Sequence, residues 1–297
     1  MKTLLAILCF AAVCMPSARA QNFDKVNIVT TRVADGVYML EGAGGNLGVG
    51  VGADAVFVID DQYAPLTPRI KAAIAALTDK PVRFILNTHW HSDHTGGNEN
   101  FAQSGTLIVA HDNVRKRMSV EHFFEAFNEK VPASPKDALP MVTFTDAVSF
   151  HINGDTLHAF HVPPAHTDGD AMIHFRRANV IHMGDLYFAS SYPFIDLSSG
   201  GSVKGMIAGA DRVLALADEN TKIIPGHGPL SDKAGLKRYR DMLATVHDRV
   251  DTLIKAGKSL KETVAAKPTA EFDAAWGKGF FTPDKFVEIV YQDLKGK

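Results

Sequence analysis

The segment Asn87–Gly97 reads NTHWHSDHTGG and holds three histidines and an aspartate within six residues. It follows residues 82–86, a short apolar stretch that is typical of a β-strand. In an extended chain the side chains of His89 and His91 point to the same side, so both imidazoles can reach one ion. This spacing of metal-ligand residue types predicts a catalytic metal site, and zinc is the metal we expect.

Asp93 and His94 follow where the chain turns into a Thr-Gly-Gly sequence, whose glycines let the backbone lie close to the site. Their side chains diverge from those of the two histidines before them, so they suit a second ion nearby. A solvent-exposed loop that is rich in histidine is the alternative interpretation. The close spacing of four ligand-type side chains favours the metal site.

Three more segments place a ligand-type side chain directly after an expected strand. His166 stands in the sequence PPAHTDGD, Asp185 in HMGDL and His227 in IPGHGP. A buried carboxylate at a strand end needs a cationic partner or a metal. Each residue alone has an ordinary explanation, such as a turn histidine or a helix-capping aspartate. Four strand ends that all offer ligands are better explained by one shared site.

Residues 1–20 form a separate unit with the pattern of a secretory signal peptide. Lys2 gives a positive start, Leu4–Val13 an apolar run, and Ala20 ends a small-x-small cleavage site. The apolar run is too short to span a bilayer with margin, and a buried N-terminal helix is the alternative. We therefore expect cleavage near Ala20, a mature chain of residues 21–297, a periplasmic or secreted location, and no stable membrane anchor.

The composition excludes several functions and limits the metal chemistry. The 297 residues carry 31 basic and 33 acidic side chains, so no electrostatic footprint for nucleic acid is expected. Both cysteines, Cys9 and Cys14, lie in the signal segment, so the mature chain has neither a disulfide nor a thiolate nucleophile. Any metal must therefore be bound by nitrogen and oxygen ligands alone. The expected partner is a small-molecule substrate.

The rest of the chain shows no linker or repeat and predicts a single domain over residues 21–297. Thr67 and Pro68 begin a helix, and a long amphipathic helix covers residues 236–253. We expect strands at residues 26–33, 37–41, 47–51, 55–59, 82–86, 180–183 and 222–224, with further strands between residues 141 and 175. Two similar halves of strands and helices fit two sheets sandwiched between outer helices.

With these motifs in place, the chain resembles the metallo-β-lactamase superfamily over nearly all of the mature sequence. The HxHxDH run, the single downstream histidine, the Gly-Asp pair at a strand end and the final Gly-His-Gly occur in the family's order. The resemblance implies an α+β fold, a four-layer αβ/βα sandwich of two mixed β-sheets flanked by helices. It implies one metal bound by His89, His91 and His166, a second bound by Asp93, His94 and His227, and Asp185 bridging the two.

The implied activity is that of an exported dinuclear zinc-dependent hydrolase with two Zn²⁺ ions per chain. Zinc with three protein ligands keeps an open position for water and lowers the pKa of that water to about 7. Two ions about 3.5–4 Å apart hold the resulting hydroxide and polarise the substrate oxygen. Asp93 is the expected catalytic residue, because it can orient the hydroxide and help move its proton to the leaving group. The bond cleaved would be a lactam, a lactone or another ester-like bond.

Two departures from the family pattern leave β-lactamase activity open. The best-known zinc β-lactamases have cysteine at the position of Asp185, and many have, at the position of Phe188, a lysine that grips the antibiotic carboxylate. Export to the periplasm, where such antibiotics are met, favours the activity. The alternative from another class is a mononuclear iron oxidoreductase resembling persulfide dioxygenases, which bind iron with two histidines and the strand-end aspartate. A metal-binding protein without catalysis is the third interpretation.

Several other residues are expected to support or cover the site. Asp60 and Asp61, which end a strand, are candidates for holding the metal-binding histidines, although a turn facing solvent is an equal alternative for Asp61. The glycine-rich loop Gly42–Asn46 is a candidate flap over the cleft. Three aromatic side chains are candidates for lining the cleft, with at least one of them expected in the core: Phe188, Tyr192 and Phe194.

Overall fold

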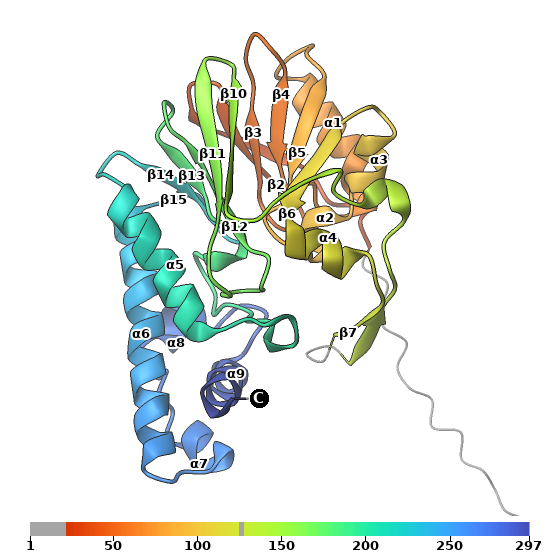
Figure 1. Ribbon diagram of the computed structural model, residues 1–297. Helices are drawn as coiled ribbons and strands as arrows, with labels where there is room; N and C mark the ends of the chain where they lie inside the picture. Colours follow the sequence, from red (N-terminus) through yellow and green to blue (C-terminus); the bar gives the residue numbers. More distant parts are fainter. Residues whose placement is uncertain (1–21, 125–127, 297) are drawn as a thin grey trace, which may run out of the picture.

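The protein folds into two β-sheets that face each other, with helices on both outer sides (Figure 1). The computed structural model describes residues 22–124 and 128–296, so the expected signal peptide, residues 1–20, lies outside the described residues. One sheet has seven strands and the other has six. This arrangement confirms the sandwich of two mixed sheets flanked by helices that was expected from the sequence.

The seven-stranded sheet carries the strand that leads into the histidine-rich segment. Its first four strands pair antiparallel, and the pairs from β4 onward are parallel. In spatial order the strands are β1 (Val29–Ala34), β2 (Val37–Glu41), β3 (Leu47–Gly50), β4 (Val56–Ile59), β5 (Val82–Leu86), β6 (Leu107–His111) and β9 (Val142–Phe144). The last two residues of β5 are fully buried, because Ile85 packs in a cluster with residues of α1 and Leu86 in a cluster with residues of the six-stranded sheet.

The six-stranded sheet is antiparallel except for the parallel pair β13 and β14. Its strands are, in spatial order, β10 (Ala147–Ile152), β11 (Asp155–His161), β12 (Ala171–Phe175), β13 (Val180–His182), β14 (Lys222–Ile224) and β15 (Ser231–Asp232). A separate hairpin of β7 (His122–Phe124) and β8 (Glu129–Val131) lies outside both sheets.

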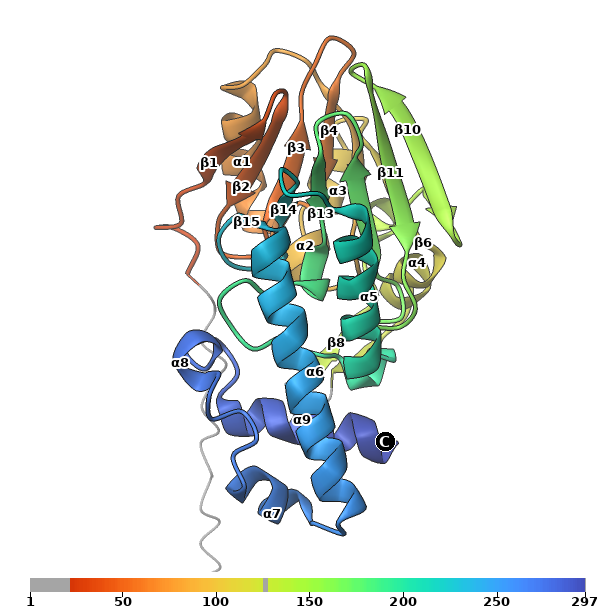
Figure 2. The same ribbon diagram turned by 90° about the vertical axis from the view of Figure 1, so that its left-hand side faces the viewer.

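Helices cover the outer face of each sheet (Figures 1 and 2). The helices α1 and α3 lie outside the seven-stranded sheet, and α5 and α6 lie outside the six-stranded one. The α-helices are α1 (Thr67–Ala75), α2 (Ser92–Thr95), α3 (Asn98–Ala102), α4 (Asp112–Met118), α5 (Val203–Leu216), α6 (Lys233–Lys255), α7 (Leu260–Ala265), α8 (Asp273–Trp276) and α9 (Pro283–Lys295). Within the described ranges, none of the helices combines the length and apolar character needed to cross a membrane.

Most boundaries expected from the sequence are confirmed within one to three residues. The first strand begins at Val29 rather than at residue 26, because the chain before it makes a turn in which Val26 N donates to Phe23 O. The long helix α6 begins at Lys233, earlier than expected, because the Asp232 side chain caps it by accepting from the backbone N–H of Gly235 at 2.8 Å.

The strands that precede the ligand-type residues all end at the same edge of the sandwich. In the seven-stranded sheet β4 and β5 run parallel, so their carboxyl ends lie side by side. In the six-stranded sheet β11, β13 and β14 share one direction, since β12 is antiparallel to both of its neighbours. The chain therefore leaves five strands at one edge, where the two sheets can bring their loops together.

The C-terminal helices extend the core beyond the six-stranded sheet. Buried residues of α9, including Phe286 and Val290, join the cluster that contains Met242 and Val246 of α6. The ring of Phe286 stacks on Tyr192, with ring centroids 4.7 Å apart. Figure 2 shows α9 lying across the end of the bundle, below the two sheets. The C-terminal segment is thereby placed against the loop that follows β13.

Candidate metal centre

A first group of four buried side chains converges at this edge: His89, His91, His166 and Asp185. His91 Nδ1 lies 3.1 Å from His89 Nε2 and 2.9 Å from His166 Nε2. Asp185 Oδ2 lies 3.5 Å from His166 Nε2. Three imidazole nitrogens meet at one point with a carboxylate oxygen beside them, which is a donor set suited to a divalent metal ion.

A second group lies beside the first and consists of Asp93, His94 and His227. Asp93 Oδ2 is 3.3 Å from His227 Nε2 and 3.5 Å from His94 Nε2. The His94 side chain is fully buried, whereas those of His227 and Asp93 are 30% and 21% exposed. The opening towards solvent is therefore on the side of Asp93 and His227.

The carboxylate of Asp185 touches both groups. Its Oδ1 lies 3.0 Å from His94 Nε2, and its Oδ2 lies 3.4 Å from His227 Nε2. Asp185 Oδ1 and His94 Nε2 are both buried, yet neither atom has a hydrogen-bond partner. A buried polar atom without a partner costs about 1–3 kcal/mol, and a metal ion between these two atoms would satisfy both. The residues present thus fit a dinuclear centre in which Asp185 is shared.

The charges of the centre favour bound cations. Burial lowers the pKa of His89 well below its usual range and that of His166 to about 4, so both imidazoles are neutral, the form that binds metals. Burial would raise the pKa of Asp185, but His227 and His94 hold it well below its usual range. Burial would lower the pKa of His227, yet Asp185 and Asp93 raise it to about 10. The second group therefore attracts positive charge.

Asp60 holds His94 in place, as expected from the sequence. Asp60 Oδ2 accepts from His94 Nδ1 at 2.8 Å, which leaves His94 Nε2 directed at the centre. The same carboxylate accepts from the backbone N–H and the hydroxyl of Thr88, both at 2.7 Å. Asp61 has a different role from the one expected. Its buried side chain accepts from Gly97 N at 2.8 Å, and its backbone N–H donates to His94 O at 2.9 Å, so Asp61 fixes the turn after the histidines and contacts no imidazole ring by a hydrogen bond of its carboxylate.

Three groups that support the first metal-binding group were not found from the sequence. Asp196 Oδ2 accepts from His91 Nε2 at 3.0 Å, and the backbone oxygen of Phe194 accepts from His166 Nδ1 at 2.8 Å. Asp170 Oδ2 accepts from the backbone N–H of His166 at 2.7 Å. Each bond fixes which ring nitrogen, or which stretch of backbone, faces the centre. The sequence offered two signals for these supporting residues, namely an acidic residue four positions after His166, which is Asp170, and another in the loop after β13, which is Asp196.

We expect Asp196→Asn to weaken metal binding by about 10- to 100-fold and to lower kcat/KM by a similar factor. The amide cannot stabilise the His91 imidazole as a carboxylate does, although its shape is retained. Zinc affinity is measured by competition with a chromophoric chelator. Asp35→Asn, at an exposed turn, is the control. An Asp196→Asn protein with the affinity of wild type would contradict the role given to Asp196.

The loop Gly42–Asn46, a candidate flap, lies against the second group and is tied down there. Asn46 Nδ2 donates to the backbone oxygens of Pro225 and Gly228, at 3.0 and 2.8 Å. Gly45 N donates to Asp93 O at 3.1 Å. The loop therefore borders the second group, and hydrogen bonds hold it to the two segments that carry Asp93 and His227.

We expect Gly45→Ala to lose the metal of the second group. A Cβ at residue 45 would lie 2.1 Å from His94 Cε1, and the ring cannot withdraw because it is buried and bonded to Asp60. Metal content per chain, measured by mass spectrometry of the purified protein, should fall from two towards one. Ala43→Gly loosens the same loop without adding an atom and serves as the control. Two metals in Gly45→Ala would refute the steric argument.

The three aromatic residues after Asp185 have different surroundings. Tyr192 is 1% exposed and packs in the core, which confirms that at least one of them is a core residue. Phe188 stacks on the His227 ring with centroids 5.1 Å apart, and Phe194 stacks on His91 at 5.7 Å. Two of these aromatics therefore lie against the metal-binding groups.

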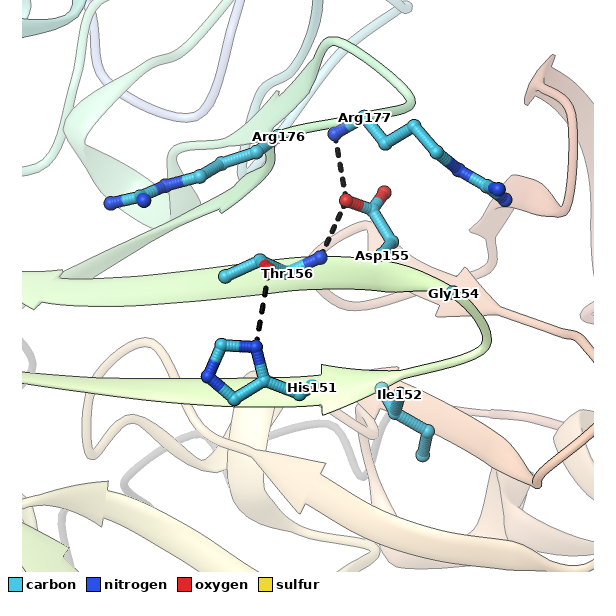
Figure 3. Close-up of a pocket in the computed structure, with 7 residues that line it drawn as sticks. All are labelled: His151, Ile152, Gly154, Asp155, Thr156, Arg176 and Arg177. Atoms are coloured by element: carbon cyan, nitrogen blue, oxygen red, sulfur yellow. Dashed lines mark hydrogen bonds between the residues drawn. The ribbon is translucent and has the colours of Figure 1, made fainter.

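A hollow of about 440 Å³ lies at the β10–β11 hairpin (Figure 3). None of the seven ligand-type side chains of the two metal-binding groups lines it. Its acidic residue, Asp155, accepts from the backbone N–H groups of Thr156, Arg177 and Ala178. Figure 3 shows the side chains of Arg176 and Arg177 pointing in opposite directions. The hollow therefore lacks the converging groups of a catalytic centre.

Comparison with known sequences agrees with this fold. The sequence model of the metallo-beta-lactamase superfamily matches residues 49–231, more than half of the chain. The chain belongs to the metallo-β-lactamase superfamily. Its clustered histidine and aspartate side chains form two groups that are consistent with a dinuclear metal site of this fold.

Several curated proteins are similar over part or most of the chain. A lactamase-like protein, aptB, of Emericella nidulans is 27% identical over 62% of this chain and 50% of its own length. A hydroxyacylglutathione hydrolase of Nitrosococcus oceani is 28% identical over 60% of each chain. The alpha subunit of a 2,4-dinitroanisole O-demethylase of Nocardioides is 25% identical over 86% of this chain and 73% of its own. The chain thus spans only 50–60% of the first two relatives.

Solved structures show the same fold at low sequence identity. The DIM-1 metallo-beta-lactamase superposes with a TM-score of 0.60 and 17% identity, over 74% of this chain and 99% of its own. The inverting sec-alkylsulfatase Pisa1 of Pseudomonas superposes with a TM-score of 0.70 and 15% identity, over 89% of this chain and 50% of its own. These likenesses establish the fold and leave the substrate open.

Proposed function

We propose that this protein is an exported dinuclear zinc hydrolase that cleaves a lactam, a lactone or another ester-like bond in a small molecule. The single observation that carries the proposal is the placement of Asp185, whose two oxygens reach the first and the second group at once. All the side chains involved offer nitrogen or oxygen, and imidazole with carboxylate is a common zinc ligand set.

Zinc ions held by the two groups would supply a nucleophilic water at neutral pH and would polarise the substrate oxygen. The chain itself supplies orientation and proton transfer. Asp93 lies at the opening, with its Oδ2 3.3 Å from His227 Nε2 and 3.5 Å from His94 Nε2. This carboxylate can therefore orient the attacking water and carry the proton to the leaving group.

A second candidate function is the mononuclear iron oxidoreductase. It needs two histidines and the strand-end aspartate, all of which are present in the first group. The second group favours the hydrolase, because Asp93, His94 and His227 converge within 4.8 Å and are additional to the three ligands that the mononuclear centre needs. The zinc hydrolase accounts for both groups.

The names of the similar proteins support hydrolysis but point to different bonds. They include a hydroxyacylglutathione hydrolase, a metallo-beta-lactamase and a sec-alkylsulfatase. Many zinc β-lactamases have a lysine that grips the antibiotic carboxylate at the position of Phe188, whose ring here stacks on His227 with centroids 5.1 Å apart. This apolar side chain argues for a substrate other than a classical β-lactam.

A panel assay with metal analysis tests the proposal. Protein purified without added metal is analysed for zinc and iron, and is then assayed on a chromogenic cephalosporin, lactones, aryl esters and phosphodiesters. We expect two zinc ions per chain and turnover of a lactone or ester. One iron per chain with oxygen consumption would replace the hydrolase proposal, and bound metal without turnover would favour a non-catalytic protein.

Export is a separate proposal that rests on residues 1–20. We expect the protein, expressed in a Gram-negative host, to reach the periplasmic fraction with its N-terminus near Gln21. Intact-mass measurement of the fractionated protein checks this. Lys2→Glu combined with a polar residue in the apolar run should keep the unprocessed chain in the cytoplasm. A full-length cytoplasmic wild-type chain would be the contrary result.

A further inference from the structure

Aromatic rings from separate parts of the chain gather on the His91 side of the metal centre. The His91 ring has Trp90 at 4.9 Å, Phe124 at 5.1 Å and Phe194 at 5.7 Å, measured between ring centroids. Phe124 and Phe194 are themselves 5.6 Å apart. Phe194 also lies 5.7 Å from His166, so these rings border the first group directly.

The aromatic surface continues into the C-terminal segment. Phe281 stacks on Phe194 with ring centroids 5.3 Å apart, and Phe280 meets Phe281 edge-on at 4.8 Å. Phe280 is 74% exposed, an unusual position for a large apolar side chain. Both residues lie outside residues 49–231, the part of the chain that matches the family. We call Trp90, Phe124, Phe194, Phe280 and Phe281 the aromatic wall.

Packing fixes the C-terminal part of the wall against the loop after β13. Tyr192 N donates to Trp276 O at 3.0 Å, and the Tyr192 hydroxyl donates to Asp273 Oδ1 at 2.8 Å. Gly279 lies so close to Ser191 that an added Cβ would be 2.2 Å from the Ser191 Cβ. The segment that carries Phe280 and Phe281 is therefore held in one position beside the centre.

The described rings of the wall offer apolar contact through their faces and edges. Aromatic faces and edges bind aryl rings and alkyl chains well, and they do not compensate the desolvation of a carboxylate. The rings therefore favour an uncharged aryl or alkyl part of a substrate over a carboxylate.

We propose that the aromatic wall binds an uncharged aryl or alkyl group next to the scissile bond, so that the substrate class is a lactone or ester with an apolar substituent. This inference rests on the proposed function, because it assumes that the bond lies over the two metal-binding groups. It assigns substrate selection to Phe280 and Phe281, two residues that the family match does not include.

Binding and turnover are tested separately. Zinc-loaded protein is titrated by calorimetry with hydroxamic acids of increasing chain length, from acetohydroxamic to octanohydroxamic acid, and with benzohydroxamic acid. We expect affinity to rise about threefold per methylene group over the first few groups. Analogues that end in a carboxylate should bind more weakly than alkyl analogues of equal length. Flat affinity along the series, or preference for the carboxylate, would overturn the proposal.

Substitutions test whether the aromatic wall causes the dependence of affinity on chain length. In Phe194→Ala and Phe280→Ala we expect the gain in affinity from the shortest to the longest acid to fall by at least about fivefold. Phe123→Ala is the matched control, because Phe123 is also exposed and, in a strand, faces the opposite side from Phe124. Thermal melting and zinc content confirm that each variant is folded and loaded. An equal fall in Phe123→Ala, or none in the wall variants, would refute the assignment.

Turnover of esters with the same acyl chains distinguishes the two proposals. A rise in kcat/KM with chain length, lost in Phe280→Ala, supports both. Chain-length-dependent binding without any turnover would leave the wall established and the hydrolase proposal wrong. Turnover without chain-length dependence of binding or rate would keep the hydrolase proposal and overturn the wall.

Discussion

The His91→Ala variant is expected to lose about 10³-fold or more in kcat/KM, because a missing ligand removes several kcal/mol of stabilisation by the metal. His91 Nδ1 is the atom closest to both other imidazoles of the first group, at 3.1 and 2.9 Å. Without it, His89 and His166 retain only Asp185 as a third ligand. We therefore expect zinc content to fall below two per chain, measured together with the steady-state rate.

The same substitution should also lower stability. Asp196 is buried, and its pKa is held low by hydrogen bonds from His91, Ser198 and Ser199 although burial opposes this. Removing the imidazole takes away one partner of a buried carboxylate, at a cost of about 1–3 kcal/mol. Chemical denaturation of the metal-free proteins measures this difference. His151→Ala, at an exposed position of β10, should change neither stability nor rate appreciably. Full activity in His91→Ala would refute the site.

The seven ligand-type residues could be predicted because each follows a strand in a recognisable local pattern. His89 and His91 come after the apolar strand β5, and Asp185 and His227 follow β13 and β14. The strand ends share one edge, so local patterns at separate places in the sequence lead to one site. The structure brings all seven side chains together. Their metal binding stays a prediction until metal is measured.

The supporting residues could not all be predicted, because their partners are remote in sequence. Asp196 lies 105 positions from His91 and bonds to it only because the loop after β13 folds back over the centre. The role of Asp60 was inferred from its place at a strand end. Its unusual backbone, with a positive φ of 59°, could not be inferred from the sequence. This backbone geometry lets one carboxylate reach both Thr88 and His94.

The position of the C-terminal segment was also beyond sequence reasoning. Its helices have ordinary amphipathic patterns, which predict a buried face without naming the surface that buries it. The contacts of Tyr192 with Phe286, Trp276 and Asp273 show that the loop after β13 is the surface against which these helices pack. They bring Phe281 next to Phe194, so the C-terminal segment lies beside the metal-binding groups although it is far in sequence from every metal-binding motif.

Asp185→Asn is expected to lose the second metal while keeping the first. The amide has nearly the same shape, but it lacks the charge that both groups share, and its NH₂ group would face His94 or His227. The first group retains three imidazoles, which suffice for one zinc ion. We expect one zinc per chain and a fall in kcat/KM of about 10²-fold.

Two further measurements test whether Asp185 is shared by both metal ions: the stabilisation of the variant by zinc and a second substitution at the same position. Zinc should raise the melting temperature of Asp185→Asn less than that of wild type, because fewer ions bind the folded state. Asp185→Cys is the informative comparison, since a thiolate is a good zinc ligand and should retain the second ion. If Asp185→Asn still binds two ions with wild-type affinity, then Asp93, His94 and His227 hold the second ion alone. In that case the carboxylate 3.0 Å from His94 contributes only to the packing of the centre.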